Sequence, residues 1–449
     1  MASTKKPELL SPAGNLLKLK YALAYGADAI YAGVPKFSLR TRENDFNEIS
    51  LKEGIKYTHD LKKKIYLTLN IFAHNTKINS FLKELEKVVQ WNPDGLIMAD
   101  PGLVNIALKE YPHIPIHLST QANVTNWTAV QFWRDLGVKR IILSRELSLK
   151  EIREIHERVP NIELECFVHG AICIAYSGRC LITNYMNHRD ANQGTCTNSC
   201  RWQYEVEEIP ESILEHEKQQ ITSFSLDDKS SKNIFVREEH RPDEKFSLQE
   251  DLHGTYMFNS KDLCAVELLK ELYDSGIISF KIEGRTKSEY YAAMATRSYR
   301  RAIDDFVQDK PFDPNILLDL QALSNRSYTS GFYTRNPREY GENYHDARSI
   351  ERTHKAVGME CTYDHENKFL EFEAKNKITI GTEVEIITPE KIEKCVVNQL
   401  YDRNDNPVDS GHGGAGRYHF YYSENPGHFA VIRRKLYPEE LKRVTNPVN

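Results

Sequence analysis

Residues 7–285 alternate short apolar runs with amphipathic segments, and this alternation constrains the fold more than any other feature. The apolar runs occupy 7–14, 28–34, 63–72, 94–100, 114–121, 140–147, 162–170 and 276–285. Segments of helical periodicity, such as "FLKELEKVVQW", lie between them. Continuous apolar strands alternating with helices indicate a parallel sheet covered on both faces. Eight strands is the number that closes a (β/α)8 barrel, so the sequence predicts an α/β fold with a TIM-like barrel.

A doubly wound open sheet is the alternative for the same alternation. Its dinucleotide-binding version is disfavoured, because no G-x-G-x-x-G follows the first apolar run.

The spacing of the runs also predicts the domain organisation. The seventh and eighth runs are separated by an insertion over 170–275, far longer than an ordinary connection in a barrel. From about residue 350 the pattern changes to strict alternation, as in "KFLEFEAKN" and "RYHFYY", with turns rich in Gly, Asn, Asp and Pro. We therefore predict a barrel catalytic domain over 1–345 and a small C-terminal all-β, barrel-like domain over 346–449.

The chain has no run of about 18 apolar residues. It also has no apolar segment near its start that would indicate a secretory signal. We therefore expect a cytoplasmic protein without a membrane partner, in which thiols stay reduced. The formal net charge of −5 excludes a globally basic nucleic-acid coat protein, but it leaves room for a local basic face.

Four of the eight cysteines lie at the start of the insertion, in the pattern C-x6-C-x15-C-x3-C: Cys173, Cys180, Cys196 and Cys200. Zinc sites favour paired C-x2–4-C hooks, and only the last two cysteines form one. Iron–sulfur clusters accept more varied spacing. The spacing therefore favours a 4Fe–4S cluster and leaves zinc, or unliganded thiols, as alternatives. Cys166 and Cys264 are reserve ligands.

Each apolar run ends in residues that can take part in chemistry. They include Ser11, Asn70, Asp100, Gln121, Arg145, His169, Lys281, Glu283 and Arg285. In a barrel the C-terminal strand ends form the mouth of the active site, so these residues predict a polar pocket there. The alternative is that they are ordinary solvated loop residues.

Basic residues cluster in three places, interleaved with Tyr and Phe. The clusters are Arg40 with Arg42, Arg297 with Arg300 and Arg301, and Arg433 with Arg434 and Lys435. Such mixtures supply phosphate contacts and stacking surfaces for RNA, although each cluster alone is also typical of a solvated face. The sequence contains no H-E-x-x-H, no G-x-S-x-G and no papain-like nucleophile motif, so a proteolytic site is not predicted.

Several strings in the chain resemble one known family. "ELLSPAGN", "GADAIYAGV", "ECFVHGAICIAYSGRCLIT", "NQGTCTNSCRW" and "KIEGRTKS" are similar to the prokaryotic collagenase-like "peptidase U" family, and within it to the branch that hydroxylates tRNA. The resemblance implies a TIM-like barrel with a four-cysteine iron–sulfur site. It also implies an enzyme that forms 5-hydroxyuridine at the wobble position of tRNA, without oxygen and with prephenate as co-substrate.

The family's cysteine motif falls on Cys173, Cys180, Cys196 and Cys200. Relatives that act in ubiquinone biosynthesis take one ligand from outside this segment, so the fourth ligand stays open between Cys200 and another thiol.

The resemblance and the strand ends together suggest residue roles. Glu283, His169 and Lys281 are the candidate catalytic residues, with the first two suited to proton transfer. The candidate substrate-binding residues are Arg40, Arg42, Gln121, Arg145 and Arg285, and their guanidinium groups suit phosphates or the carboxylates of prephenate. We expect the C-terminal domain to help hold tRNA through Arg433–Lys435.

Three other functions remain as alternatives. They are hydroxylation of ribosomal RNA or a quinone precursor, a collagenase-like peptidase, and a non-catalytic RNA-binding scaffold.

Overall fold

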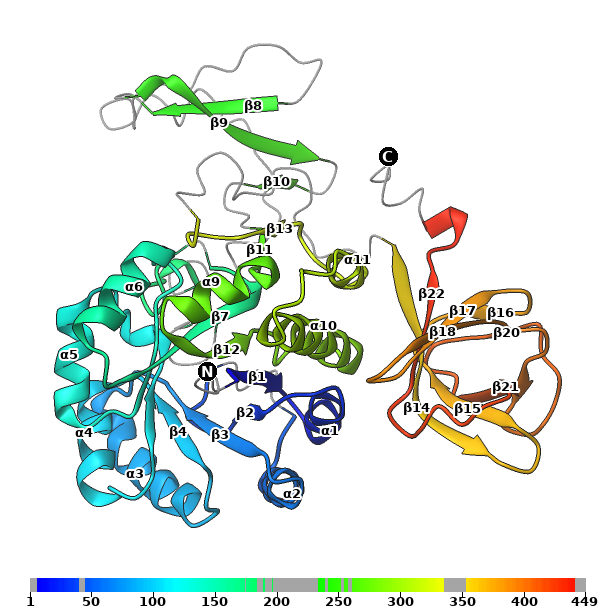
Figure 1. The fold of residues 1–449 in the computed structure, drawn as a ribbon, viewed down its shortest axis with the longest axis horizontal. Helices are drawn as coiled ribbons and strands as arrows, with labels where there is room; N and C mark the ends of the chain where they lie inside the picture. The colour runs from blue at the N-terminus through cyan, green and yellow to red at the C-terminus, as the bar shows by residue number, and fades with distance from the viewer. Residues whose placement is uncertain are drawn as a thin grey trace, which may run out of the picture.

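The computed structural model of the chain describes residues 6–39, 45–173, 175–183, 189, 196, 261–334 and 353–440, together with the backbone of three strands between 233 and 256. Figure 1 shows a barrel surrounded by helices and a separate set of strands formed by the C-terminal part of the chain.

Eight parallel strands form the barrel: β1 (Glu8–Ala13), β2 (Ala29–Gly33), β3 (Lys64–Leu69), β4 (Gly95–Met98), β5 (Ile116–Leu118), β6 (Arg140–Ile142), β7 (Glu163–Ala171) and β12 (Ile277–Ile282). Each of the predicted apolar runs coincides with one of these strands, and β7 extends one residue beyond its run. The last strand, β12, pairs in parallel with both β1 and β7, which closes the sheet. The predicted TIM-like barrel is therefore confirmed.

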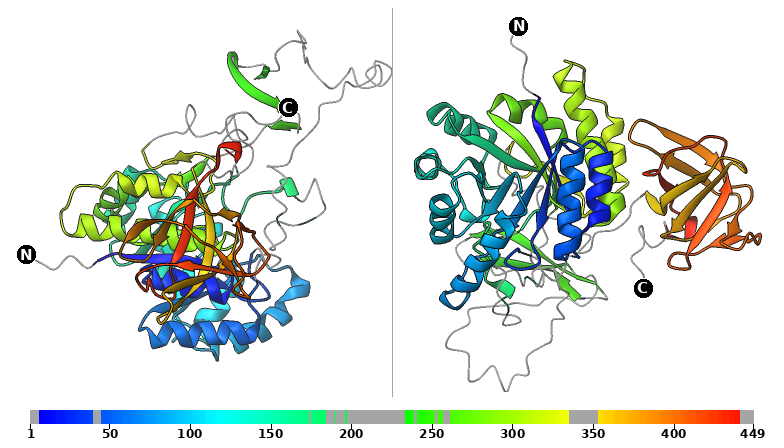
Figure 2. Two further views of the ribbon diagram at one scale, coloured as in Figure 1. Left: turned by 90° about the vertical axis from the view of Figure 1, so that its right-hand side faces the viewer. Right: turned by 90° about the horizontal axis from the view of Figure 1, so that it is seen from below.

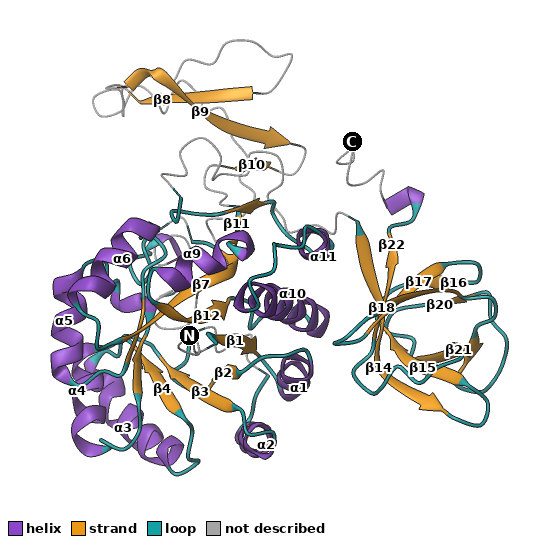
Figure 3. Ribbon diagram, in the orientation of Figure 1, coloured by secondary structure: helices purple, strands orange, loops and turns teal. Residues whose placement is uncertain are grey.

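Helices cover the outside of the barrel (Figure 3). They are α1 (Leu16–Ala24), α2 (Glu48–Asp60), α3 (Asn75–Val89), α4 (Pro101–Glu110), α5 (Trp127–Leu136), α6 (Leu149–Arg158), α9 (Leu269–Asp274) and α10 (Glu289–Val307). Most begin at a residue whose side chain accepts a first-turn N–H. Asp100, for example, caps α4 with Oδ1. In the described part of the chain, no helix is long and apolar enough to cross a membrane.

The insertion follows β7, as predicted. It contains an antiparallel sheet of β8 (Asn233–Glu238), β9 (Arg241–Asp251) and β10 (Gly254–Tyr256). The chain then returns to the barrel through β11 (Asp262–Cys264), which pairs antiparallel with the end of β7. β13 (Tyr328–Thr329) pairs with β11 and follows the short helix α11 (Asn315–Gln321).

The C-terminal part is an all-β domain with its own hydrophobic core, also as predicted. Its larger sheet contains β14 (His354–Asp364), β15 (Phe369–Ala374), β17 (Glu383–Ile387), β18 (Ile392–Val396), β19 (Tyr401–Asp402), β21 (Arg417–Tyr421) and β22 (Val431–Lys435), and β16 (Ile378–Thr379) pairs with β20 (Ser410–Gly411). The predicted boundary at 345/346 lies outside the described residues and stays a prediction.

The C-terminal domain packs beside α1 and α10 (Figure 2). The hydroxyl of Tyr25, which directly follows α1, donates to the carbonyls of Ile387 and Phe429. Arg433 of β22 donates to Asp319 of α11 at 3.0 Å. Hydrogen bonds and ion pairs therefore join the barrel to the C-terminal sheet.

The expectation that Arg433–Lys435 contact RNA is wrong for the two arginines. Arg433 is 4% exposed and Arg434 is 1% exposed. Their guanidinium groups pair inside the protein, with Glu385 and Asp319 for Arg433 and with Glu440 for Arg434. A buried guanidinium that already has carboxylate partners cannot also bind a phosphate.

Candidate active site

A cavity of about 170 Å³ lies where the C-terminal ends of the barrel strands meet the cysteine segment of the insertion. Its polar and charged barrel residues are Thr68, Asn70, Ser119, Thr120, Gln121, Arg145, Lys281, Glu283 and Arg285, and Tyr31 and Phe167 supply aromatic rings. Most of the predicted strand-end residues therefore come together at one place, which is the position of active sites in this fold.

Three of the four predicted cluster ligands, Cys173, Cys180 and Cys196, line this cavity. Burial raises the pKa of the Cys180 thiol, and the neighbouring thiols of Cys173 and Cys196 raise it further. Within the described residues, no group of three His, Cys, Asp or Glu side chains is arranged to hold a metal ion. Cys200 lies outside the described residues, so the four-cysteine site stays a prediction.

The two reserve ligands lie elsewhere. Cys166 is 2% exposed within the barrel core, and burial raises its pKa to about 12. Burial also raises the pKa of Cys264 to about 11, and its sulfur accepts a hydrogen bond from the hydroxyl of Tyr299. Neither thiol is among the residues that line the cavity. Both fit the description of small, protonated core residues.

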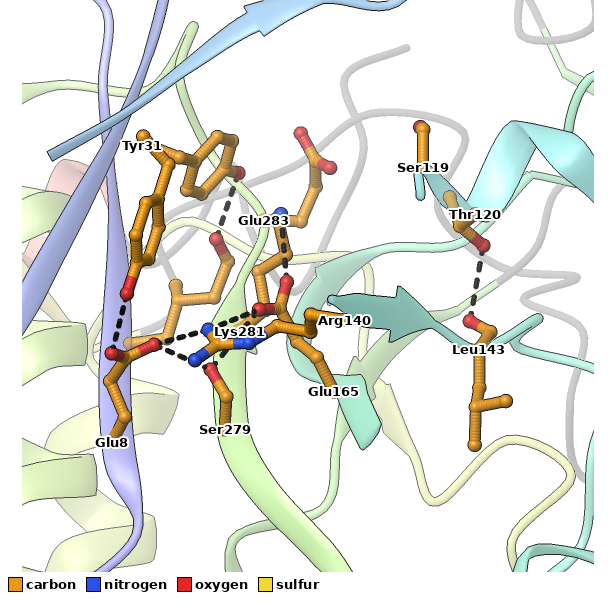
Figure 4. A network of polar contacts seen from close by, with 12 residues as sticks. Glu8, Tyr31, Ser119, Thr120, Arg140, Leu143, Glu165, Ser279, Lys281 and Glu283 are labelled. Atoms are coloured by element: carbon orange, nitrogen blue, oxygen red, sulfur yellow. Dashed lines mark hydrogen bonds and ion pairs between the residues drawn. The ribbon is translucent and has the colours of Figure 1, made fainter. Parts of the chain in front are cut away.

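The floor of the cavity is a buried ion pair between Lys281 of β12 and Glu165 of β7, with Nζ and Oε1 2.9 Å apart (Figure 4). The ammonium group also lies over the ring of Tyr31, 4.3 Å from its centroid. Burial lowers the pKa of Lys281, although the charge of Glu165 opposes that shift. The positive charge of Lys281 is thus stabilised mainly by the buried carboxylate of Glu165.

The ion pair belongs to a network that continues along the barrel interior, away from the cavity. Arg140 of β6 contacts Glu165 at 3.1 Å and Glu8 of β1 at 2.6 Å. The hydroxyl of Ser279 donates to both of these carboxylates. Tyr66 donates to the second oxygen of Glu8 at 2.8 Å. The charges in the barrel interior are therefore paired, as buried charges must be.

Arg285, predicted to bind substrate, is used inside the protein. It is 8% exposed, and it donates to the hydroxyls of Ser38 and Thr68 and to the carbonyl of Leu39 at 2.6 Å. Arg285 lines the cavity, but its hydrogen bonds make it the anchor of the loop that follows β2.

Arg145 and Glu283 face the cavity with a looser pairing. Their closest side-chain atoms are 3.4 Å apart, and the guanidinium lies 3.7 Å from the centroid of the Phe167 ring. Arg145 also donates to Ser177 of the cysteine segment at 3.4 Å. Of the two arginines that line the cavity in the described part of the chain, Arg145 thus has the longer hydrogen bonds.

His169 does not line the cavity, although the sequence places it at the end of β7. Its ring is 1% exposed and packs against Tyr291, Tyr299 and Tyr328. Burial lowers its pKa to about 4, which keeps the ring neutral. The backbone N–H of Glu283 donates to the carbonyl of His169 at 2.8 Å, but the His169 ring lies outside the cavity that Glu283 and Lys281 line. A direct proton transfer from His169 to substrate therefore has no support from its position.

The remaining cationic residues fall into two groups, one outside the described residues and one that forms ion pairs inside the protein. Arg40 and Arg42 lie outside the described residues. Arg297, Arg300 and Arg301 pair with carboxylates of the barrel and its helices, so the second basic cluster is structural.

Glu165 and Arg140 were not singled out from the sequence. A signal was present: Glu163 and Glu165 alternate with apolar residues in a run that reads as a buried strand. Charged residues at such positions need buried partners of opposite charge.

The fold and the cavity define a class of protein, a TIM-like barrel with a cysteine-lined site at its mouth. Comparison with known proteins supplies the family. Residues 14–343 match Peptidase family U32, and residues 352–433 match the Peptidase family U32 C-terminal domain. The chain belongs to peptidase family U32.

Close relatives carry a different kind of name. The chain is 44% identical to "tRNA hydroxylation protein P" of Haemophilus influenzae, over 97% of this chain and 98% of the relative. It is 47% identical to the Escherichia coli protein of the same name, over 86% and 87%. It is also 30% identical to the Escherichia coli "23S rRNA 5-hydroxycytidine C2501 synthase", over 69% of this chain and 41% of that protein.

Proposed function

We propose that the protein is a cytoplasmic tRNA-modifying enzyme that forms 5-hydroxyuridine at the wobble position, without oxygen and with prephenate as co-substrate. The observation that carries this proposal is the identity, over nearly the whole length of both chains, to relatives named tRNA hydroxylation proteins. The site is consistent with that chemistry. Polar side chains, two aromatic rings of the barrel and three thiols surround one cavity.

We propose that Cys173, Cys180 and Cys196 hold a 4Fe–4S cluster, with Cys200 as the fourth ligand and zinc as the alternative metal. The supporting observation is that three thiols from one short segment line the same cavity. A bound cluster would supply one-electron redox chemistry next to the substrate.

The barrel residues would bind and orient the reactants. A base inside a stacked anticodon cannot reach the cavity, so the target uridine must leave its stack. The Tyr31 and Phe167 rings would then offer apolar surfaces to it. Arg145 would pair with a carboxylate of the co-substrate, since guanidinium binds carboxylate in a bidentate manner. Glu283, released from Arg145, would accept a proton at the cavity.

Mass spectrometry of tRNA nucleosides tests the proposal. The gene is deleted in a strain whose oxygen-dependent route to the same nucleoside is also disabled, and the strain is complemented with wild type or with Cys173→Ala. We expect 5-hydroxyuridine to disappear on deletion, to return with the wild-type gene and to stay absent with the variant. Unchanged 5-hydroxyuridine after deletion would contradict the function. Its return with Cys173→Ala would contradict a catalytic role for the cluster and favour a structural one.

The metal is tested separately by anaerobic purification. We expect a coloured protein with iron and acid-labile sulfide, and Cys180→Ala should lose both. A colourless protein with stoichiometric zinc would replace the cluster by zinc.

Ribosomal RNA hydroxylation is the second candidate function. The ribosomal relative supports it, because that protein is named for a 5-hydroxycytidine in 23S rRNA. The same deletion strain decides between the two, since 5-hydroxycytidine lost from ribosomal RNA with unchanged tRNA would favour this second function.

A further inference from the structure

Two carboxamides at the cavity, Asn70 and Gln121, have an orientation that the backbone determines. The amide N–H of Leu39 donates to Oδ1 of Asn70 at 3.2 Å. A backbone N–H can only donate, so the atom of Asn70 that faces it must be the oxygen, and Nδ2 must point the other way. Nδ2 of Asn70 then donates to Oε1 of Gln121 at 2.7 Å. The orientation of the second carboxamide therefore follows from that of the first.

The start of this chain of contacts is rigidly held. Arg285 donates to the carbonyl of Leu39 at 2.6 Å and to the hydroxyl of Ser38 at 2.8 Å. Asn70 is 8% exposed and Gln121 is 7% exposed, so water does not compete freely for these groups. Rotation of either amide would place two donors or two acceptors against each other in a buried site, which is costly.

The part of the Gln121 carboxamide that remains available to a ligand is consequently the donor Nε2. Its oxygen accepts from Asn70 and from the hydroxyl of Ser119 at 3.3 Å. Its Nε2 has no hydrogen-bond partner among the described residues, and Gln121 lines the cavity. An amide N–H₂ group that faces a cavity without a partner among these residues is a group that a ligand is expected to satisfy.

Gln121 also lies next to the cysteine segment. Gly178, between Cys173 and Cys180, has φ +73°, and a Cβ added there would overlap the carbonyl oxygen of Gln121. The segment that carries the thiols thus packs directly on the backbone of the residue that presents the donor. A ring held by this donor would lie beside the cysteines.

We infer that Gln121 selects the base, with Nε2 donating to the exocyclic O4 of uracil and rejecting cytosine. This inference rests on the proposed function. Uracil carries an acceptor at position 4, whereas cytosine carries an amino group that donates. Two donors facing each other leave both unsatisfied, and sites built on a hydrogen bond discriminate strongly for that reason. Position 4 adjoins C5, so this contact holds the carbon to be hydroxylated at a fixed place in the cavity.

Two variants reverse the polarity of the group by different routes. Gln121→Glu replaces the donor by a carboxylate oxygen, while its other oxygen still accepts from Asn70. Asn70→Asp keeps the oxygen that faces Leu39 but turns the atom facing Gln121 into an acceptor. Gln121 must then rotate its amide and present its own oxygen to the cavity. Both variants should favour cytosine, and in the second one the chemistry of residue 121 is unchanged.

The experiment expresses each variant of the full chain in the deletion strain, with a plasmid tRNA that carries cytidine in place of the target uridine. Nucleosides from this tRNA and from the native one are quantified by mass spectrometry. We expect the ratio of 5-hydroxycytidine to 5-hydroxyuridine to rise at least about tenfold with both variants. Gln90→Glu, at an exposed position that directly follows α3, makes the same chemical change away from the cavity and should leave the ratio unchanged.

Three outcomes would overturn the inference, and they are distinguishable. If the wild-type protein forms no hydroxylated pyrimidine, the proposed function fails and the inference fails with it. If the wild type is active and both variants keep its ratio, Gln121 does not read the base. If both variants lose both products while their iron content and unfolding midpoints match the wild type, Gln121 positions the cavity and does not select the base.

Discussion

At the scale of single residues, the barrel interior is held by charges as well as by apolar packing. Glu165 is fully buried and contacts Lys281, Arg140 and Ser279. Taking a carboxylate out of water is costly unless partners of opposite charge replace the lost solvation. The carboxylate and its two cations therefore depend on each other. Removing one leaves the others buried without the partner that offsets their lost solvation.

Glu165→Gln should lower the free energy of unfolding by about 3–5 kcal/mol, because it leaves Lys281 buried without a counter-charge. Urea unfolding followed by circular dichroism measures this loss. Glu163→Gln is the matched control. Its side chain is 28% exposed and it shares Arg140, so we expect a loss of only about 1 kcal/mol. Equal losses for the two variants would show that the buried ion pair contributes no more to the free energy of unfolding than the exposed one.

His169 should make stability depend on pH. Its pKa is about 4 in the folded protein, against about 6.5 when unfolded, because the buried ring resists charging. Asp262 raises this pKa and Lys287 lowers it, but burial dominates. A lowered folded-state pKa stabilises the protein fully above pH 6.5, and the contribution is lost as the pH falls toward 4.

We expect this one group to account for about 2 kcal/mol of the stability lost between pH 7 and pH 5. His169→Phe should remove that part of the dependence. Urea unfolding of both proteins at the two pH values measures the difference. An identical pH dependence for both would mean that the ring is already accessible to protons in the folded protein.

At the scale of elements, the cysteine segment depends on a glycine. Gly178→Ala should displace this segment, because φ +73° is unfavourable for alanine and the new Cβ would meet the carbonyl of Gln121. Under the proposed 4Fe–4S assignment, we expect iron bound per chain to fall by more than half, measured after anaerobic purification, with the barrel still folded. Gly381→Ala is the control. It has φ +81° but open space around it, so strain without a clash should leave the iron content unchanged.

The barrel could be predicted from the sequence because the strand–helix alternation is a local pattern, and every predicted strand run coincides with a strand. The position of the cavity followed from the same pattern, since parallel strands end on one side. Which polar residues bond inside the protein, and which remain available at the cavity, could not be predicted in this way. Arg285 and Arg145 both end apolar runs, yet one is saturated by Ser38, Thr68 and Leu39 while the other faces the cavity.

The reason is that pairing depends on residues far apart in the chain. Arg433 looks like a surface cation in "VIRRKLY", and only the fold brings Asp319 to it across more than a hundred residues. His169 is a similar case. The sequence places it at a strand end, but the direction of its side chain depends on β11 and α10, which come much later. Residue type and spacing do not show which distant residues will be such partners.

At the scale of the whole molecule, Asp319 joins the barrel to the C-terminal domain. Its carboxylate lies 3.0 Å from Arg433 of β22, 3.4 Å from Arg297 of α10 and 3.5 Å from Arg301. These three cations come from both parts of the chain, and the carboxylate is buried between them. Asp319 thus adds a buried set of ion pairs to the hydrogen bonds of Tyr25 that also join the two parts.

Asp319→Asn should loosen this junction, because it leaves the buried Arg297 without its carboxylate partner and removes one of the two carboxylates that pair with Arg433. We expect a single unfolding transition to separate into two, seen by calorimetry, and faster proteolysis between the domains. Asp313→Asn is the control, since Asp313 pairs with Arg301 at a more exposed site and has no contact with β22. A single transition for both variants would show that the remaining contacts join the parts without the Asp319 ion pairs.

The closure of the barrel by β12 has a consequence for how the chain folds during synthesis. β12 supplies Lys281 and Ser279, and it is the strand that seals the gap between β1 and β7. Ribosomes add about 5–20 residues per second, so β1 waits on the order of tens of seconds for its partner. During that time Glu165 and Glu8 lack part of their hydrogen bonding, and two strand edges are open to other chains. The nascent protein should therefore need chaperone protection until β12 has emerged.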